Sequence, residues 1–114
     1  MPYDIHHEKS YSQEASNVYD AALKSAAELK GQMLSSSPNG LRFEVKFDKT
    51  ILGKVLGDRT QMTCVVQAAE NGSKVVVDAY PLDAVGRKLM FGARKGVTQT
   101  VIDLFTAHLE NHLK

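Results

Sequence analysis

The segment from residue 60 to residue 80 constrains the fold most, because it has the pattern of two strands joined by a tight turn. Asn71-Gly72 is a dipeptide that favours a type I′ turn, and the alternating segment Lys74–Tyr80 follows it. Alternate positions before the turn share one side of a strand: Met62, Cys64, Val66 and Ala68. The sequence therefore predicts an antiparallel β-hairpin.

Three other segments also have the character of strands. Residues 3–9 and 41–48 alternate apolar and polar side chains with a period of two, which is typical of half-buried strands. Residues 50–57 are apolar on both alternating sets, and Gly53 permits a β-bulge there. Two arrangements stay open for this segment: Leu52 and Leu56 emerge on the outer side of a strand, or a bulge turns both sets inward.

Two helices complete the pattern. Ser12 can cap a helix whose apolar positions recur every three or four residues, with Gly31 as a stop signal: Ala15, Val18, Ala22, Ala26, Leu29 and Met33. The cluster 35–40 then predicts a loop. A final helix is expected from about residue 94 to the C-terminus, because a broad apolar sector recurs at helical spacing: Val97, Val101, Leu104, Phe105 and Leu109.

The expected element order is strand, helix, four strands, helix. Short links between the later strands favour an antiparallel sheet, and charged outer sides on residues 42–48 and 74–78 place both helices on the other face. With 114 residues and 43% hydrophobic side chains, the chain fits one domain over residues 1–114. The predicted fold class is an α+β two-layer sandwich.

Composition excludes several classes of partner and site. A formal charge of +1 is too small for the whole surface to select nucleic acid, so we expect no nucleic-acid partner. A single cysteine, Cys64, excludes an internal disulfide and fits a small buried hydrophobe better than a catalytic thiol. No run approaches the roughly 20 apolar residues of a transmembrane helix, and a cytoplasmic location is expected.

The end of the chain carries a family resemblance. Phe91-Gly92-Ala93-Arg94-Lys95-Gly96 followed by VTQTVIDLFTAHLENHL resembles the close of small bacterial domains without an assigned function. The β-α-β4-α order resembles the helix-grip and TATA-box-binding-protein-like architectures, in which a curved antiparallel sheet wraps a long C-terminal helix. The helix-grip resemblance implies an apolar ligand between the sheet and the final helix.

The leading functional hypothesis is a non-enzymatic domain that binds a small apolar or amphipathic ligand, or a protein partner, between the final helix and the sheet. No cofactor and no catalytic residue are expected. The same side chains could instead simply fill the core. The candidate lining residues are Phe43, Val45, Phe47, Met62, Phe91, Val101, Phe105 and His108.

Residues 86–96 form a second candidate site, because basic side chains and glycines precede the final helix there. Exposed amides at a helix start bind anions, and the candidate anion-binding residues are Arg87, Lys88, Arg94 and Lys95. The segment lacks the GxxxxGK[ST] spacing of a nucleotide-binding loop. The alternative is that residues 89–91 form a short last strand and the basic side chains are solvated.

Two further hypotheses belong to other functional classes. An exposed strip formed by Leu52 and Leu56 would suit a second copy of the chain in a symmetric homodimer. His108 and His112 stand four residues apart on the final helix, a spacing that metal ligands use. Because HLENH differs from HExxH and fixes no third ligand, no metal site is assigned to them.

Overall fold

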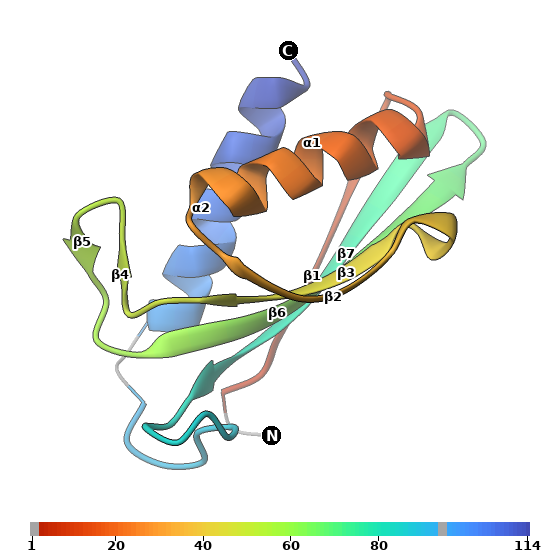
Figure 1. Cartoon of the computed structure of the whole chain (residues 1–114). Helices are drawn as coiled ribbons and strands as arrows, with labels where there is room; N and C mark the ends of the chain where they lie inside the picture. Colours follow the sequence, from red (N-terminus) through yellow and green to blue (C-terminus); the bar gives the residue numbers. More distant parts are fainter. Residues whose placement is uncertain (1–2, 94–95) are drawn as a thin grey trace.

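The computed structural model describes residues 3–93 and 96–114. Two helices lie on the same side of a curved antiparallel sheet, so the predicted α+β two-layer arrangement is confirmed (Figure 1). The elements, in chain order, are β1 (Ile5–Tyr11), α1 (Ala15–Glu28), β2 (Gln32–Ser37), a short 3₁₀ turn (Pro38–Gly40), β3 (Arg42–Phe47), β4 (Thr50–Ile51), β5 (Lys54–Val55), β6 (Arg59–Ala69), β7 (Gly72–Leu82) and α2 (Val97–His112).

Among the described residues, five strands form the main sheet in the order β1-β7-β6-β3-β2. The β6–β7 hairpin at its centre is confirmed, with Ala69 paired to Gly72. The predicted turn type is wrong: Glu70 and Asn71 are the two central residues, and neither has the positive φ that a type I′ turn requires.

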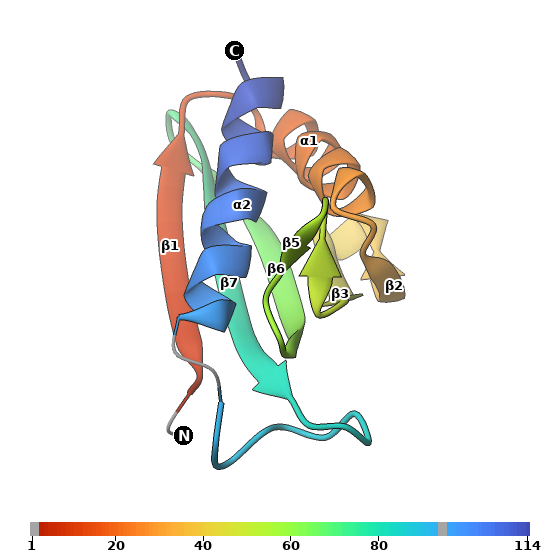
Figure 2. The same ribbon diagram turned by 90° about the vertical axis from the view of Figure 1, so that its left-hand side faces the viewer.

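The inner face of the sheet and the facing sides of both helices form one core. Alternation along the central strands places Met62 and Cys64 of β6 on this face, where both are fully buried. The ring of Phe43 on β3 packs against that of Phe105 on α2 with centroids 6.4 Å apart, so the C-terminal helix closes directly on the sheet (Figure 2).

Helix α1 begins and ends differently from the sequence prediction. The N-cap is Glu14 instead of Ser12, and no side-chain capping bond forms there. At the other end the amides of Lys30 and Gly31 donate to the carbonyls of Ala27 and Ala26, which is the Schellman pattern. Lys30 takes the left-handed conformation with φ of 62°.

Gly31 follows the end of α1, as the predicted stop signal requires, and it also has a packing role. A Cβ added at this position would lie 2.5 Å from Cγ2 of Val45 and 2.8 Å from Cε1 of Phe47. Beyond it the chain enters β2, an edge strand whose residues are all exposed, so Met33 lies on a strand and not on the helix. The predicted loop over residues 35–40 is therefore wrong for residues 35–37.

The segment 50–57 leaves the main sheet and forms its own small hairpin, β4–β5. Ile51 and Leu56 are buried, whereas Leu52 and Val55 are exposed. This distribution matches neither expected arrangement, because the segment is a hairpin and not one continuous strand. Helix α2 begins at Val97, about one turn later than predicted, and residues 89–91 form a loop in place of the short strand that the sequence allowed.

Candidate functional site

Most of the residues predicted to line a ligand site lie inside the core. Their side chains are fully buried and pack together between α2 and the sheet: Phe43, Val45, Phe47, Met62, Val101 and Phe105. The structure does not bring Phe91 to them, because its side chain is 86% exposed in the β7–α2 loop. His108 stands at the edge of the core, where its Nδ1 lies 2.9 Å from Oε1 of Glu28.

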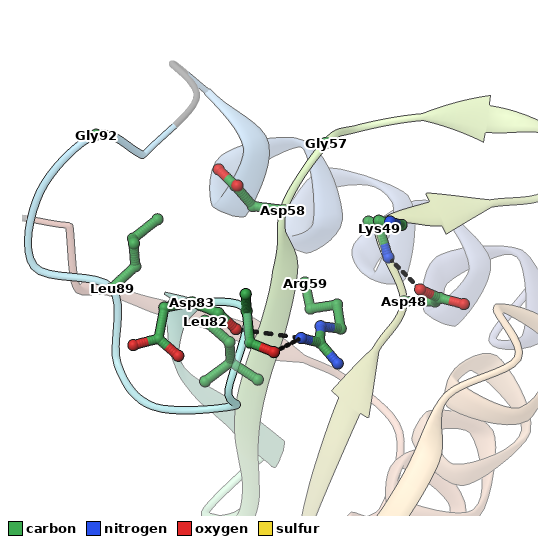
Figure 3. A pocket seen from close by; sticks show the side chains of 10 residues that line it. Asp48, Lys49, Gly57, Asp58, Arg59, Leu82, Asp83, Leu89 and Gly92 are labelled. Atoms are coloured by element: carbon green, nitrogen blue, oxygen red, sulfur yellow. Dashed lines mark hydrogen bonds between the residues drawn. The ribbon is translucent and has the colours of Figure 1, made fainter.

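A cavity of about 460 Å³ lies instead at the end of the sheet where the β3–β4, β5–β6 and β7–α2 connections meet (Figure 3). This volume falls within the range of about 300–1,000 Å³ that is usual for small-molecule sites. We call it the mouth pocket, and its lining residues are Asp48, Lys49, Gly57, Asp58, Arg59, Leu82, Asp83, Ala84, Leu89 and Gly92.

Hydrogen bonds fix the β7–α2 connection that forms one wall of the mouth pocket. Oδ1 of Asp83 accepts from the amide of Val85 at 3.0 Å and from that of Arg87 at 2.9 Å. The Arg59 guanidinium donates to the carbonyls of Asp83 at 3.2 Å and Ala84 at 2.9 Å (Figure 3). This wall is therefore held by side chains from two different parts of the chain, Asp83 in the connection itself and Arg59 at the start of β6.

The lining combines apolar surface with charges of both signs. Leu82 is buried and Leu89 is half-buried, and Figure 3 draws both beside the aspartates and Arg59. A molecule with an apolar body and a polar or charged group would satisfy both kinds of surface. The sequence did not predict this site because its residues come from three separate connections of the chain.

The structure describes two of the four predicted anion-binding residues. Arg87 is exposed, whereas Nζ of Lys88 is 2.9 Å from Oδ2 of Asp4 and 4.4 Å from the centre of the Tyr80 ring. Arg94 and Lys95 lie outside the described residues. Anion binding by this set stays a prediction.

His108 and His112 do converge, and they do so on a carboxylate from the other helix. Oε1 of Glu28 lies 2.9 Å from Nδ1 of His108 and 2.9 Å from Nε2 of His112. Hydrogen bonding to these two rings, His108 first, lowers the pKa of Glu28. The pair thus links α2 to α1 through Glu28. Over the part of the chain that the structure describes, no group of three histidine, cysteine or acidic residues could hold a metal ion.

Cys64 is a free cysteine on the buried face of β6. Burial raises the pKa of its thiol to about 12, which keeps it protonated at neutral pH. A protonated, inaccessible thiol is a poor nucleophile, so Cys64 contributes packing.

Comparison with solved structures identifies the fold. The crystal structure of Ara h 8.0201 superposes with a TM-score of 0.62, at 11% identity, over 97% of both chains. Protein CV1439 from Chromobacterium violaceum gives 0.61 at 12% identity, over 99% of this chain and 95% of that one. The chain has a helix-grip-like fold.

A third neighbour is larger than this chain. The di-domain ARO/CYC protein StfQ, from the steffimycin biosynthetic pathway, superposes with a TM-score of 0.57 at 9% identity, and the match spans 94% of this chain and 42% of StfQ. At such identities the shared property is the helix-grip-like fold. No protein-family model matches the sequence, and no curated protein sequence matches it.

Proposed function

We propose that this helix-grip-like chain is a non-enzymatic binding domain for a small amphipathic ligand, and that the ligand occupies the mouth pocket. The observation that carries the proposal is a cavity of about 460 Å³ with Leu82 and Leu89 beside charged groups of both signs. The helix-grip-like fold supports ligand binding in general, and the position that the resemblance implies, between the sheet and the final helix, differs from the mouth pocket.

The mouth pocket suits a ligand better than the deeper position between α2 and the sheet. Phe43 and Phe105 fill that deeper space, and a ligand there would have to displace buried rings that already touch. Displacing close-packed side chains costs several kcal/mol, on the order of the cost of a large core substitution. The mouth pocket requires no such displacement.

Titration with 1-anilinonaphthalene-8-sulfonate tests the proposal, because its rings match Leu82 and Leu89 and its sulfonate matches Arg59. Ala84→Trp would place a large ring in the pocket, and we expect it to weaken binding at least tenfold. Val85→Trp is the matched control, since Val85 is exposed on the same loop and does not line the pocket. Equal binding by all three proteins would refute the proposal.

Amide chemical shifts would then locate the probe. We expect the largest changes at residues 57–59 and 82–89, which surround the mouth pocket. Changes centred on Val101 and Phe105 would instead support the deeper site expected from the sequence.

Self-association through the segment 51–56 is a second candidate, and the exposure of Leu52 and Val55 on the β4–β5 hairpin favours it. Leu56 no longer contributes to it, since that side chain is buried. A dimer of this kind would dissociate on Leu52→Glu substitution and persist on Met33→Glu substitution at the β2 edge. Sedimentation equilibrium distinguishes the two outcomes.

A further inference from the structure

Most of the exposed large apolar side chains belong to two segments that border the mouth pocket. The hairpin segment, residues 49–57, presents Leu52 with 59% of its surface exposed and Val55 with 78%. The loop segment, residues 84–93, presents Val85 with 73% and Phe91 with 86%, together with Met90. Figure 1 draws both segments at the end of the molecule away from the β6–β7 turn.

Both segments are basic. The hairpin segment carries Lys49 and Lys54 and no acidic residue, and the loop segment carries Arg87 and Lys88 and no acidic residue. The neighbouring aspartates 48, 58 and 83 line the mouth pocket between the two segments. Beyond the pocket, this end of the described structure therefore presents exposed apolar side chains, which we call the apolar tips, with basic side chains among them.

The apolar tips project from anchored backbones. In the hairpin segment Ile51 and Leu56 insert into the core, and the amide of Leu56 donates to the carbonyl of Lys49 at 2.8 Å. In the loop segment the amide of Leu89 donates to the carbonyl of Pro81 at 2.9 Å. Leu52, Val55 and Val85 thus project from hydrogen-bonded segments, and burying these side chains against another surface costs little backbone ordering.

We propose that the hairpin and loop segments dock this end of the protein on an anionic lipid bilayer. Leu52, Val55 and Phe91 would enter the interface between headgroups and acyl chains, and Lys49, Lys54 and Arg87 would lie at the headgroups. The docking is peripheral: in the described residues no helix is long and apolar enough to cross a bilayer.

Charge favours a lipid surface over a second copy of the chain. In a twofold dimer the same patch meets itself, so the two copies of Lys54 would approach one another without an acidic partner in the hairpin segment. An anionic bilayer supplies the opposite charge to Lys49, Lys54 and Arg87, whereas Lys88 is already paired with Asp4.

Vesicle co-sedimentation of the full chain tests the proposal. We expect binding to phosphatidylcholine vesicles that contain phosphatidylserine, weaker binding to pure phosphatidylcholine vesicles, and a decrease with added salt. The double variant Leu52→Ser/Phe91→Ser should lose at least about tenfold in partitioning. The serine side chains lack the favourable free energy that Leu52 and Phe91 gain when they move from water into the bilayer interface. Lys54→Glu should lose at least about fivefold on the anionic vesicles.

Matched controls distinguish binding through this surface from non-specific adsorption to vesicles. Met33→Ser/Leu34→Ser removes the exposed apolar pair on β2, and Lys24→Glu reverses an exposed charge on α1; both should bind as wild type does. No binding to anionic vesicles, or equal losses in the controls, would overturn the proposal. So would a wild-type dimer, measured without vesicles, that Leu52→Ser/Phe91→Ser dissociates.

A spectroscopic test reports insertion directly. The chain contains no tryptophan, so Phe91→Trp introduces a single reporter at the tip of the loop segment. Its emission should shift to the blue with anionic vesicles, and an unchanged spectrum would contradict insertion. Neither assay uses a ligand, so loss of dye binding to the mouth pocket and loss of vesicle binding are separate results.

Discussion

Gly31 is the position where the smallest substitution should have a large effect. The Cβ of Gly31→Ala would stand 2.5 Å from Cγ2 of Val45 and 2.8 Å from Cε1 of Phe47. Carbon atoms in favourable contact are about 3.5–4.0 Å apart, so each neighbour must retreat by about 1 Å. Both neighbours are fully buried, where side chains are closely packed.

Overpacking of this kind lowers the free energy of unfolding by about 1–3 kcal/mol. For a domain of this size that corresponds to a decrease in Tm of roughly 4–12 °C. Urea and thermal unfolding followed by circular dichroism measure both quantities. Gly40→Ala is the matched control, because its Cβ would meet nothing closer than Oγ of Ser37 at 3.4 Å. Equal effects of the two substitutions would refute the reasoning.

Two further predictions concern titratable groups. Hydrogen bonds from His108 and His112 lower the pKa of Glu28 in the folded state, so its stabilising contribution is present above the ordinary value of 4.5 and is lost as pH falls through the lowered pKa. Urea unfolding across this range should therefore show a steeper acid loss for wild type than for Glu28→Gln, whereas Glu70→Gln at the exposed turn should follow wild type; parallel curves for all three would contradict the pairing. Cys64, buried and with its pKa raised to about 12, should react with a disulfide reagent at the rate of unfolding, and rapid labelling of the folded protein would show that the β6 face is open.

The central elements could be predicted because each obeys one periodicity. Alternation in β3, β6 and β7 follows from a sheet with one face on the core, and the spacing of Val101, Phe105 and Leu109 follows from one buried side of α2. These patterns predicted the two layers and the face of the sheet that carries the helices. The patterns are the same whichever strands are neighbours, so they do not predict the order of the strands in the sheet.

β2 could not be predicted, because an edge strand exposed on both faces has no alternation to detect. Met33 also stands four residues after Leu29 and so extends the helical spacing, although the chain has already turned at Lys30. The mouth pocket could not be predicted from the sequence for a different reason. Its three aspartates stand in connections between elements, where aspartate is common, and only the fold brings Asp48 near Arg59.

The pairing of β1 with β7 determines how early in synthesis the main sheet can finish folding. Ile5 pairs with Ala79, so the first strand finds its partner only after about 70 further residues have been made. At roughly 5–20 residues per second, a ribosome needs on the order of 4–14 s to supply them. Contacts so distant in sequence place the domain among slow-folding topologies. During that interval β1 is an unpaired strand on a growing chain, and its charged residues Glu8 and Lys9 protect it from pairing with other chains.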